Sequence, residues 1–509
     1  MDAHHQHKHT RELGGGLVPP PSHRQQRRGM AAGIARERTA VTTRLWNARM
    51  EAAKAAGVMD QCSGTQAQDQ LVSKPPHRTS VRYGFEHDEG LVEAYRNPWN
   101  SVRIGRIVED LDSLAGNIAF QHCDDANPNT RPQLLVTASV DRVNLVRPLA
   151  LSEDLVLSGA VAWVGRSSMV IRMEAWPADH PDAPRDYTVG GEKENVKKVK
   201  EVVGSIPDAS GGKGAEEEEA ATAARTYEPG PSLSADFTFV ARDAVTNRGA
   251  PVNPLVPRTD AEKALFNATA ARVEAKKRRM KVRAAGDAGL SEELASAKKR
   301  FIEEQMRASR MLHELPALAP SDVIACDATR TENMFVAQPQ QRNLSGRIFG
   351  GFLLRRAFEL AFATTYVFGG ARPVFKQVSD MDFLRPVDIG DLLRFRARVL
   401  RSAEGKCGRP CVDVEVEALV TKPEALTSDI SNTFMFQFYV GSKKNNQSAT
   451  TTTEEEEVGG EDEQSPTKNA PPHAATASPR RVLPRTREEA AHVWERCERP
   501  RLDVELQQE

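Results

Sequence analysis

Cysteine is scarce in this chain of 509 residues, and its placement argues against two kinds of scaffold. The six cysteines are scattered, with no Cys-x-x-Cys pair and no spacing typical of a zinc site. We therefore expect free thiols in a reducing compartment, no disulfide framework and no bound metal.

Long hydrophobic runs and a strong net charge are also lacking. No stretch approaches the roughly 18 apolar residues that a spanning helix requires, so no membrane span is expected. The formal net charge is −1 and the pI about 6.9, which argues against a nucleic-acid partner. The basic run KKRRMKVR at 276–283 is followed by Glu292 and Glu293, and we interpret it as a solvated face of a helical linker, 276–319.

Hydrophobic residues make up 39% of the chain, which is low for a fully folded protein of this length. Three polar segments of low complexity are predicted to be disordered: 1–35, 190–232 and 442–479. The first opens an N-terminal extension, 1–79, whose Arg-rich and acid-poor start is shared with transit peptides. Because Asp2 and the nearby histidines are atypical of such peptides, the residues alone do not decide between a removable targeting segment and a flexible tail.

Two blocks of the chain, 80–275 and 320–500, repeat one another, with a tail at 501–509. Each contains Gly-Arg-Ile, at 105–107 and 346–348, leading into a helical pattern. The first pattern is amphipathic, while GFLLRRAFELAFATTY in the second is apolar nearly all round, as in a buried helix. The repeat predicts two similar domains.

Alternating segments after each helix predict four or five antiparallel strands and a short closing helix. LLVTASVDRVNLVRP and VFKQVSDMDFLRP both end in Arg-Pro, and ADFTFVARD matches NTFMFQFYV across the polar insertions. A twisted antiparallel sheet has one apolar face that a single long helix can cover, which is the hotdog arrangement. We therefore predict an α+β fold of two tandem hotdog domains, each an antiparallel sheet wrapped around a long central helix, with the sheets continuous or nearly so.

Several segments resemble one known family. SVRIGRIVEDLDSLAG is similar to the first hotdog domain, and NLSGRIFGGFLLRRAFELAFATT with FLRPVDIGDLL to the second, of double-hotdog acyl-coenzyme A thioesterases, most nearly the acyl-coenzyme A thioesterase 9 group. The resemblance implies hydrolysis of fatty acyl-coenzyme A to free fatty acid and coenzyme A without a cofactor. It also implies a homo-oligomer, a trimer of double-hotdog chains, in the mitochondrial matrix, with the cytoplasm as the alternative.

Asp112 is the candidate catalytic acid. Thioester hydrolysis needs a carboxylate that activates water or attacks directly. Asp112 follows Leu111 at the edge of the apolar stripe, and we expect the neighbouring charges of Glu109 and Asp110 to raise its pKa. The residues alone equally fit a solvated acidic helix surface. The resemblance assigns Asp112 the role of base or nucleophile.

The second half supplies candidates for holding the thioester carbonyl. Gly350 and Gly351 open its helix, where unpaired N–H groups and the helix dipole can polarise a carbonyl. Asn343, seven residues before Gly350, carries an amide that can donate as well. The alternative is that the glycines only permit tight packing and that Asn343 caps a turn. The resemblance gives Asn343 a catalytic role.

The two halves are unequal, which predicts one complete site that spans both domains. The helix position equivalent to Asp112 is Phe358, with Glu359 adjacent. Asn97 and Asn100 in the first half are the residues that could imitate Asn343. We expect the second, mirror-related site to be degenerate.

Substrate recognition is less directly indicated. The phosphates of coenzyme A require cations, and the candidates are Arg347, Arg147, Arg385 and Arg166, although structural or solvated roles fit each equally. Trp163 and Met169 could line an acyl tunnel, but core packing is favoured for both.

Two other functions fit a hotdog fold. A hotdog dehydratase uses a histidine with an acid, and His122 is the one histidine of the folded blocks near the first helix, with none in the second helix. A non-catalytic acyl-coenzyme A binding protein needs no acid. The lack of a matching histidine in the second helix argues against the dehydratase, and the pairing of Asp112 with Asn343 argues against the non-catalytic binding protein.

Overall fold

The computed structural model describes residues 42, 43, 47, 71–125, 130, 133–185, 228–243, 245–343, 346–405, 408–441 and 480–500. The predicted disordered segments 1–35 and 442–479, most of 190–232 and the tail 501–509 lie outside the described residues.

Before the linker, the described residues of the first half contain five strands and two helices, and the insertion separates the last two strands. They are β1 (Thr79–Tyr83), α3 (Glu89–Tyr95), α4 (Ile104–Cys123), β2 (Leu134–Leu145), β3 (Leu155–Val164), β4 (Ser168–Pro177) and β5 (Leu233–Arg242). The linker forms α6 (Asp260–Ala284) and α7 (Glu292–Glu314). The helix α6 thus begins well before the predicted linker and continues the helix predicted to close the first block.

The second half repeats this order. It contains β6 (Val323–Ala325), β7 (Thr331–Val336), α8 (Gly350–Gly369), β8 (Val374–Phe383), β9 (Leu392–Glu404), β10 (Pro410–Lys422), β11 (Thr427–Tyr439), β12 (Arg481–Leu483) and α9 (Arg487–Val493). The short strands β12 and β6 pair in parallel outside the main sheet, and the parallel bridge between Lys74 and Leu255 is their counterpart in the first half.

Ten strands form one sheet in the order β1-β3-β4-β5-β2-β8-β11-β10-β9-β7. The second five positions repeat the first five in reverse, and the halves join where β2 pairs with β8 in antiparallel fashion. The predicted repeat and the continuous sheet are confirmed. One detail differs from the prediction. In each half, four strands of the main sheet follow the long helix, and the fifth, β1 or β7, precedes the helix and lies at an edge of the sheet.

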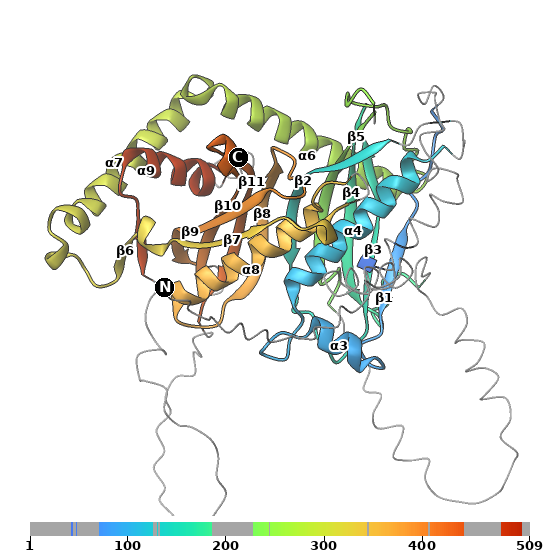
Figure 1. Ribbon diagram of the computed structural model, residues 1–509, viewed down its shortest axis with the longest axis horizontal. Coiled ribbons are helices and arrows are strands. Elements are labelled where there is room, and N and C mark those ends of the chain that lie inside the picture. The colour runs from blue at the N-terminus through green and yellow to red at the C-terminus, as the bar shows by residue number, and fades with distance from the viewer. Residues whose placement is uncertain are drawn as a thin grey trace, which may run out of the picture.

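The long helices α4 and α8 lie next to each other against one face of this sheet (Figure 1). Val140 and Val143 of β2 and Val378 and Met381 of β8 are buried beneath them. The linker helices α6 and α7 run along the opposite side, from the first half to the second (Figure 1). The hydrophobic core is therefore shared between the two halves at the level of α4 and α8.

Within the described residues, no helix is both long and apolar enough to cross a bilayer. Four cysteines lie in this part of the chain, Cys123, Cys326, Cys411 and Cys497, and all four are buried.

Candidate active site

The site is built where α4 and α8 cross, since the N-terminal turn of each helix packs on the middle of the other. A Cβ atom placed on Gly351 would lie 3.0 Å from the carbonyl oxygen of Glu109, and one on Gly105 would lie 3.3 Å from Cγ of Arg355. Glu109 and Arg355 are each the sixth residue of their helix. The two halves are therefore related by an approximate two-fold axis that passes between the helices.

Asp112 lies on this interface and not on the solvated surface of α4. Only 2% of the residue is exposed, and Glu109 and Asp110 are buried as well, so the alternative of a solvated acidic surface is wrong. The Thr137 hydroxyl of β2 donates a hydrogen bond of 3.0 Å to Oδ1 of Asp112. Among the described residues, Oδ2 of Asp112 makes no hydrogen bond of good geometry. A buried carboxylate oxygen without a well-formed hydrogen bond is costly, which is typical of a functional group.

Burial raises the pKa of Asp112 to about 6, while the hydrogen bond from Thr137 and the backbone N–H of Gly351 act to lower it. The expected rise is present, but its predicted cause was wrong. The charges of Glu109 and Asp110 are not among the causes, because α4 directs these side chains to other partners. Glu109 pairs with Arg355 at 2.8 Å, and Asp110 accepts hydrogen bonds from Tyr83 and Tyr95.

The Gly350-Gly351 turn faces this carboxylate directly. A Cβ on Gly350 would stand 3.3 Å from Oδ2 of Asp112 and 3.0 Å from the ring of Phe383. Phe349, the residue before the helix, provides no side-chain cap, so the first-turn N–H groups and the positive end of the helix dipole point toward the acid. The close approach explains why glycine occupies this turn.

Asn343 holds the loop that feeds α8. The side-chain Oδ1 of Asn343 accepts a hydrogen bond of 3.1 Å from the backbone N–H of Arg347, and the backbone N–H of Asn343 donates to the Arg347 carbonyl at 2.6 Å. The turn-capping role is therefore real. The side-chain oxygen of Asn343 accepts the hydrogen bond that closes the turn. The side-chain NH2 group carries the hydrogen-bond donors that could bind a thioester oxygen.

Asn97 is the counterpart of Asn343, since each lies seven residues before the start of the long helix. Oδ1 of Asn97 accepts from the backbone N–H of Ser101 at 3.0 Å, four residues on, just as Asn343 accepts from Arg347. Asn100 instead has a left-handed backbone, with φ of 55°. Of the two candidates named from the sequence, Asn97 is the one that reproduces the turn.

The mirror-related end of the interface contains aromatic rings in place of the acid. Phe358, the ninth residue of α8 as Asp112 is of α4, packs against Phe375 with ring centroids 5.2 Å apart. Phe375 is the counterpart of Thr137, since each precedes its Arg-Pro pair by ten residues. The contact between the Phe358 and Phe375 rings therefore takes the place of the hydrogen bond between Thr137 and Asp112. Glu359 points elsewhere and pairs with Arg103 at 2.5 Å. We call the Asp112 end the acid end and the Phe358 end the aromatic end.

Thr137 was missed by the sequence analysis. A signal existed, because aligning the two halves on Arg147-Pro148 and Arg385-Pro386 sets a polar Thr137 against Phe375. A threonine in a strand is ordinarily unremarkable, however, since its hydroxyl is easily satisfied by solvent or backbone. Only its contact with Asp112 distinguishes it.

The candidate arginines divide between the two ends of the sheet. Strand register aligns Met169 of β4 with Phe239 of β5 and Thr137 of β2, so the turn holding Arg166 lies at the acid end. Arg385 follows β8 at that same end and pairs with Asp429 at 2.5 Å.

Arg347 also lies at the acid end, in the loop before α8, with Nε 3.6 Å from Asp388. Arg147 follows the other end of β2, and its guanidinium donates to the carbonyls of Glu228 and Gly230. The structure therefore brings three of the four candidates to the acid end and places Arg147 at the aromatic end.

Three residues considered for other roles are structural. His122 is buried, with Nε2 2.8 Å from the carbonyl oxygen of Asn253, and burial lowers its pKa. Met169 is fully buried in the core, and the ring of Trp163 packs beneath Lys277. The acid and the histidine that a dehydratase requires are not brought together, since His122 lies near the C-terminal end of α4.

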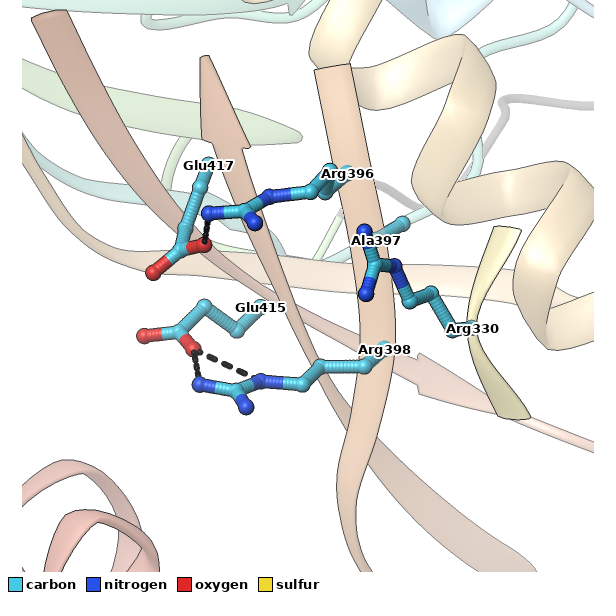
Figure 2. Close-up of a pocket in the computed structure, with 6 residues that line it drawn as sticks. All are labelled: Arg330, Arg396, Ala397, Arg398, Glu415 and Glu417. Atoms are coloured by element: carbon cyan, nitrogen blue, oxygen red, sulfur yellow. Dashed lines mark hydrogen bonds and ion pairs between the residues drawn. The ribbon is translucent and has the colours of Figure 1, made fainter. Parts of the chain in front are cut away.

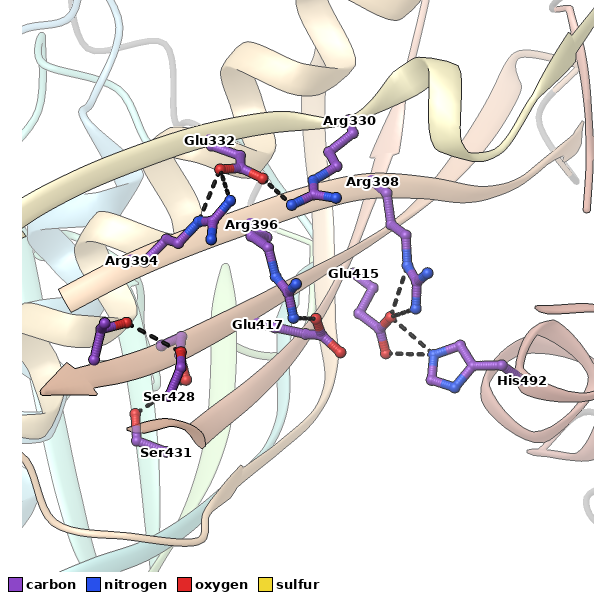
Figure 3. Close-up of polar contacts among 12 residues, drawn as sticks. Arg330, Glu332, Arg394, Arg396, Arg398, Glu415, Glu417, Ser428, Ser431 and His492 are labelled. Carbon is purple, nitrogen blue, oxygen red and sulfur yellow. Dashed lines mark hydrogen bonds and ion pairs between the residues drawn. The ribbon is translucent and has the colours of Figure 1, made fainter. Parts of the chain in front are cut away.

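A second polar region covers the sheet face turned away from α8. It surrounds a cleft of about 230 Å³ lined by Arg330, Arg396, Ala397, Arg398, Glu415 and Glu417 (Figure 2). Glu332 bridges Arg330 and Arg394, while Glu415 binds Arg398 and His492 of α9 (Figure 3). Although burial acts to raise the pKa of Glu415, His492, Arg496 and Arg398 bring it down to about 2.

This contrast separates the two carboxylates. Glu415 stays ionised and fully paired, as in a structural ion-pair network that docks α9 on the sheet. Asp112 is equally buried but lacks a cation, so it can take up a proton near neutral pH.

Comparison with known proteins agrees with this geometry. A family model described as thioesterase superfamily matches residues 105–183. The chain is 40% identical to acyl-coenzyme A thioesterase 2, chloroplastic, from Humulus lupulus, over 79% of this chain and 80% of that protein. The chain belongs to the acyl-coenzyme A thioesterase family.

Two further similarities extend the comparison. Human acyl-coenzyme A thioesterase 9, mitochondrial, is 31% identical over 71% of this chain and 72% of its own. A crystal structure of a putative oleoyl thioesterase from Lactobacillus plantarum aligns with 74% of this chain and 98% of its own, with 10% identity and a TM-score of 0.36. The family resemblance of the sequence is confirmed, and the dehydratase alternative is set aside.

Proposed function

We propose that the acid end is the single active site of this thioesterase and that Asp112 is its general base. One observation carries the proposal: a buried carboxylate, one of whose oxygens makes no hydrogen bond of good geometry, faces the open first turn of the opposite helix. A base and a carbonyl-polarising group are the two elements that thioester hydrolysis requires, and here they come from different domains.

The proposed reaction starts with the thioester carbonyl oxygen at the N-terminus of α8. Asp112 takes a proton from a water molecule as the water oxygen attacks the carbonyl carbon. The negative charge that develops on the carbonyl oxygen is stabilised by the first-turn N–H groups of α8 and the Asn343 amide. The carbon–sulfur bond then breaks, and the proton held by Asp112 goes to the leaving thiolate. With a pKa of about 6, Asp112 is ionised at neutral pH and basic enough to accept the proton.

Coenzyme A is proposed to bind at the same end of the sheet. Arg166, Arg347 and Arg385 are exposed or partly exposed there and can meet its phosphates, whereas Arg147 is occupied by backbone carbonyls at the other end. Arg385 and Arg347 are paired with carboxylates, so phosphate binding would exchange Asp429 or Asp388 for the ligand.

The test is release of free thiol from short, medium and long acyl-coenzyme A substrates by the wild-type chain and by Asp112→Asn. Turnover that disappears in the variant while substrate still binds supports the proposal. Binding without thiol release by the wild-type chain identifies a non-catalytic acyl-coenzyme A binding protein. The same panel determines the preferred chain length.

For the assembly and location we propose a trimer of double-hotdog chains inside an organelle, the mitochondrial matrix being favoured over the cytoplasm. The family resemblance supports the trimer, and relatives named as chloroplastic and mitochondrial support the organelle. The hydroxyl of the buried Thr42 donates to Asp110 at 2.6 Å, so we place the end of any removable leader before Thr42. Light scattering and N-terminal sequencing of the mature protein test the two points.

A further inference from the structure

The helix interface contains a buried ion pair that the reaction does not use. Nη1 of Arg355 lies 2.8 Å from Oε2 of Glu109, and the two residues are 8% and 1% exposed. Neither Nε of Arg355 nor Oε2 of Glu109 has a hydrogen bond of good geometry among the described residues. A buried pair of this kind seldom adds net stability over apolar residues of similar size, so its presence calls for another explanation.

The position of the pair supplies one. Because Glu109 and Arg355 are equivalent residues of α4 and α8, they meet on the approximate two-fold axis. The pair also adjoins both crossing points, since the backbone of Glu109 touches Gly351 and the side chain of Arg355 touches Gly105. Asp112 lies three residues beyond Glu109, about one helical turn, and faces Gly350.

We propose that the Glu109–Arg355 pair is the positioning element that sets α8 against α4 so that the Gly350-Gly351 turn faces Asp112. This inference rests on the active site proposed above. It also accounts for the opposite signs of the charges. Packing the first domain on a copy of itself would bring two Glu109 side chains together, and packing the second on itself would bring two Arg355 side chains together. Neither arrangement would face Asp112 toward the glycine turn, and like charges buried together would oppose both.

The experiment measures kcat and KM separately for four variants of the full chain, together with thermal unfolding. The variants are Glu109→Gln, Arg355→Gln, the reversed pair Glu109→Arg/Arg355→Glu, and the apolar pair Glu109→Leu/Arg355→Met. A positioning role predicts about a tenfold loss of kcat with little change of KM in each single variant. The reversed pair should recover kcat to within about threefold of the wild type.

The apolar pair decides the case if the single variants do not fold. It removes both buried charges at once, so it should unfold at or above the wild-type temperature while kcat stays about tenfold low. Wild-type kcat in this variant overturns the proposal. Loss of its fold also overturns the proposal, because the pair would then act on stability and not on position.

A matched control is a second ion pair at this interface, between Glu359 of α8 and Arg103, the residue before α4, whose side chains are 27% and 41% exposed. Glu359→Gln removes this contact and should leave kcat within about twofold of the wild type. Asp112→Asn, assayed in parallel, separates the two proposals. If Asp112→Asn remains active, the active-site assignment fails, whereas an inactive Asp112→Asn with fully active pair variants contradicts only the positioning role.

Discussion

At one end of the α4–α8 interface Asp112 faces the first turn of α8, and at the other end Phe358 faces the first turn of α4. Both ends have the same asparagine turn, which Asn97 and Asn343 form alike. What differs is a pair of side chains on the helix and the adjoining strand. Aspartate and threonine meet at the acid end, and two phenylalanines meet at the aromatic end.

The comparison indicates what joining two domains in one chain makes available. In a dimer of identical domains, every substitution changes both ends at once. Here Phe358 and Phe375 extend an aromatic cluster with Phe436 and Phe438 at one end, while the other retains an unpaired buried carboxylate. The ring contacts of the aromatic end stabilise the packing of α8 on its own strands, whereas the buried carboxylate of the acid end has an energetic cost.

The largest expected effect is at the acid itself. Asp112→Asn should lower kcat by a hundredfold to a thousandfold, the scale that removal of a positioned base produces. Thiol release under saturating substrate measures it. Glu359→Gln is the matched change beside Phe358, and it should keep nearly full activity because Glu359 pairs with Arg103 at the start of α4, away from Asp112. The reverse result would mean that the site lies in the other half.

Asn343→Ala should cost about 3 kcal/mol of transition-state stabilisation, or roughly a hundredfold in kcat, as loss of one oxyanion donor does in other enzymes. Part of the loss can come from the turn, since Oδ1 of Asn343 holds the Arg347 N–H. Asn97→Ala removes the same turn bond at the aromatic end and serves as the control. Equal losses in the two variants would show that the turn matters and the donor does not.

The acid end should also be the less stable one at neutral pH. Burial holds the pKa of Asp112 at about 6 when folded, above the ordinary 3.8, so the folded state binds the proton more tightly than the unfolded state. The destabilisation is absent below pH 3.8, grows as the pH rises, and is complete above about 6. Asp112→Asn should therefore raise the free energy of unfolding at pH 8 by up to about 3 kcal/mol, with little gain at pH 4. Denaturant titrations at both pH values check this.

Adding a methyl group in the first turn of α8 or of α4 tests the difference between the acid end and the aromatic end by steric crowding. Gly350→Ala places a Cβ 3.3 Å from Oδ2 of Asp112 and 3.0 Å from the Phe383 ring, and it should lower kcat about tenfold by displacing the acid. Gly105→Ala meets the Phe358 ring at 3.2 Å. It should cost a similar amount of stability but much less activity. Melting temperature and kcat measured on the same preparations distinguish the two effects.

The smallest effect is expected from Thr137→Val. Its hydroxyl lowers the pKa of Asp112, so removing it should raise that pKa above about 6. Wild-type kcat should fall as the pH drops through about 6, and in the variant this decline should begin at higher pH. Activity at pH 6.5 should then fall several-fold while activity at pH 9 changes little. An unshifted profile would show that Thr137 does not govern the ionisation of Asp112.

The fold could be predicted from the sequence because its sequence motifs are local and each occurs once in each half. The Gly-Arg-Ile repeat, the apolar stretch 351–366 and the paired Arg-Pro endings each predicted an element, and the second copy supported the first. It missed that β1 and β7 precede the helices. Short edge strands such as TSVRY are paired on one side only and carry little periodic signal.

The sequence by itself determined the repeat, the fold class, the glycine turn and which helix carries the acid. Only the tertiary structure decided that Asp112 is perturbed by burial, that Thr137 is its partner, and that Arg147 lies at the end without an acid. Each of these depends on contacts between elements far apart in the chain, set by the approximate two-fold packing of α4 on α8 and the antiparallel register of β2 on β8. Local periodicity reports which face of an element is apolar, but it does not report which residue of a distant element that face will meet.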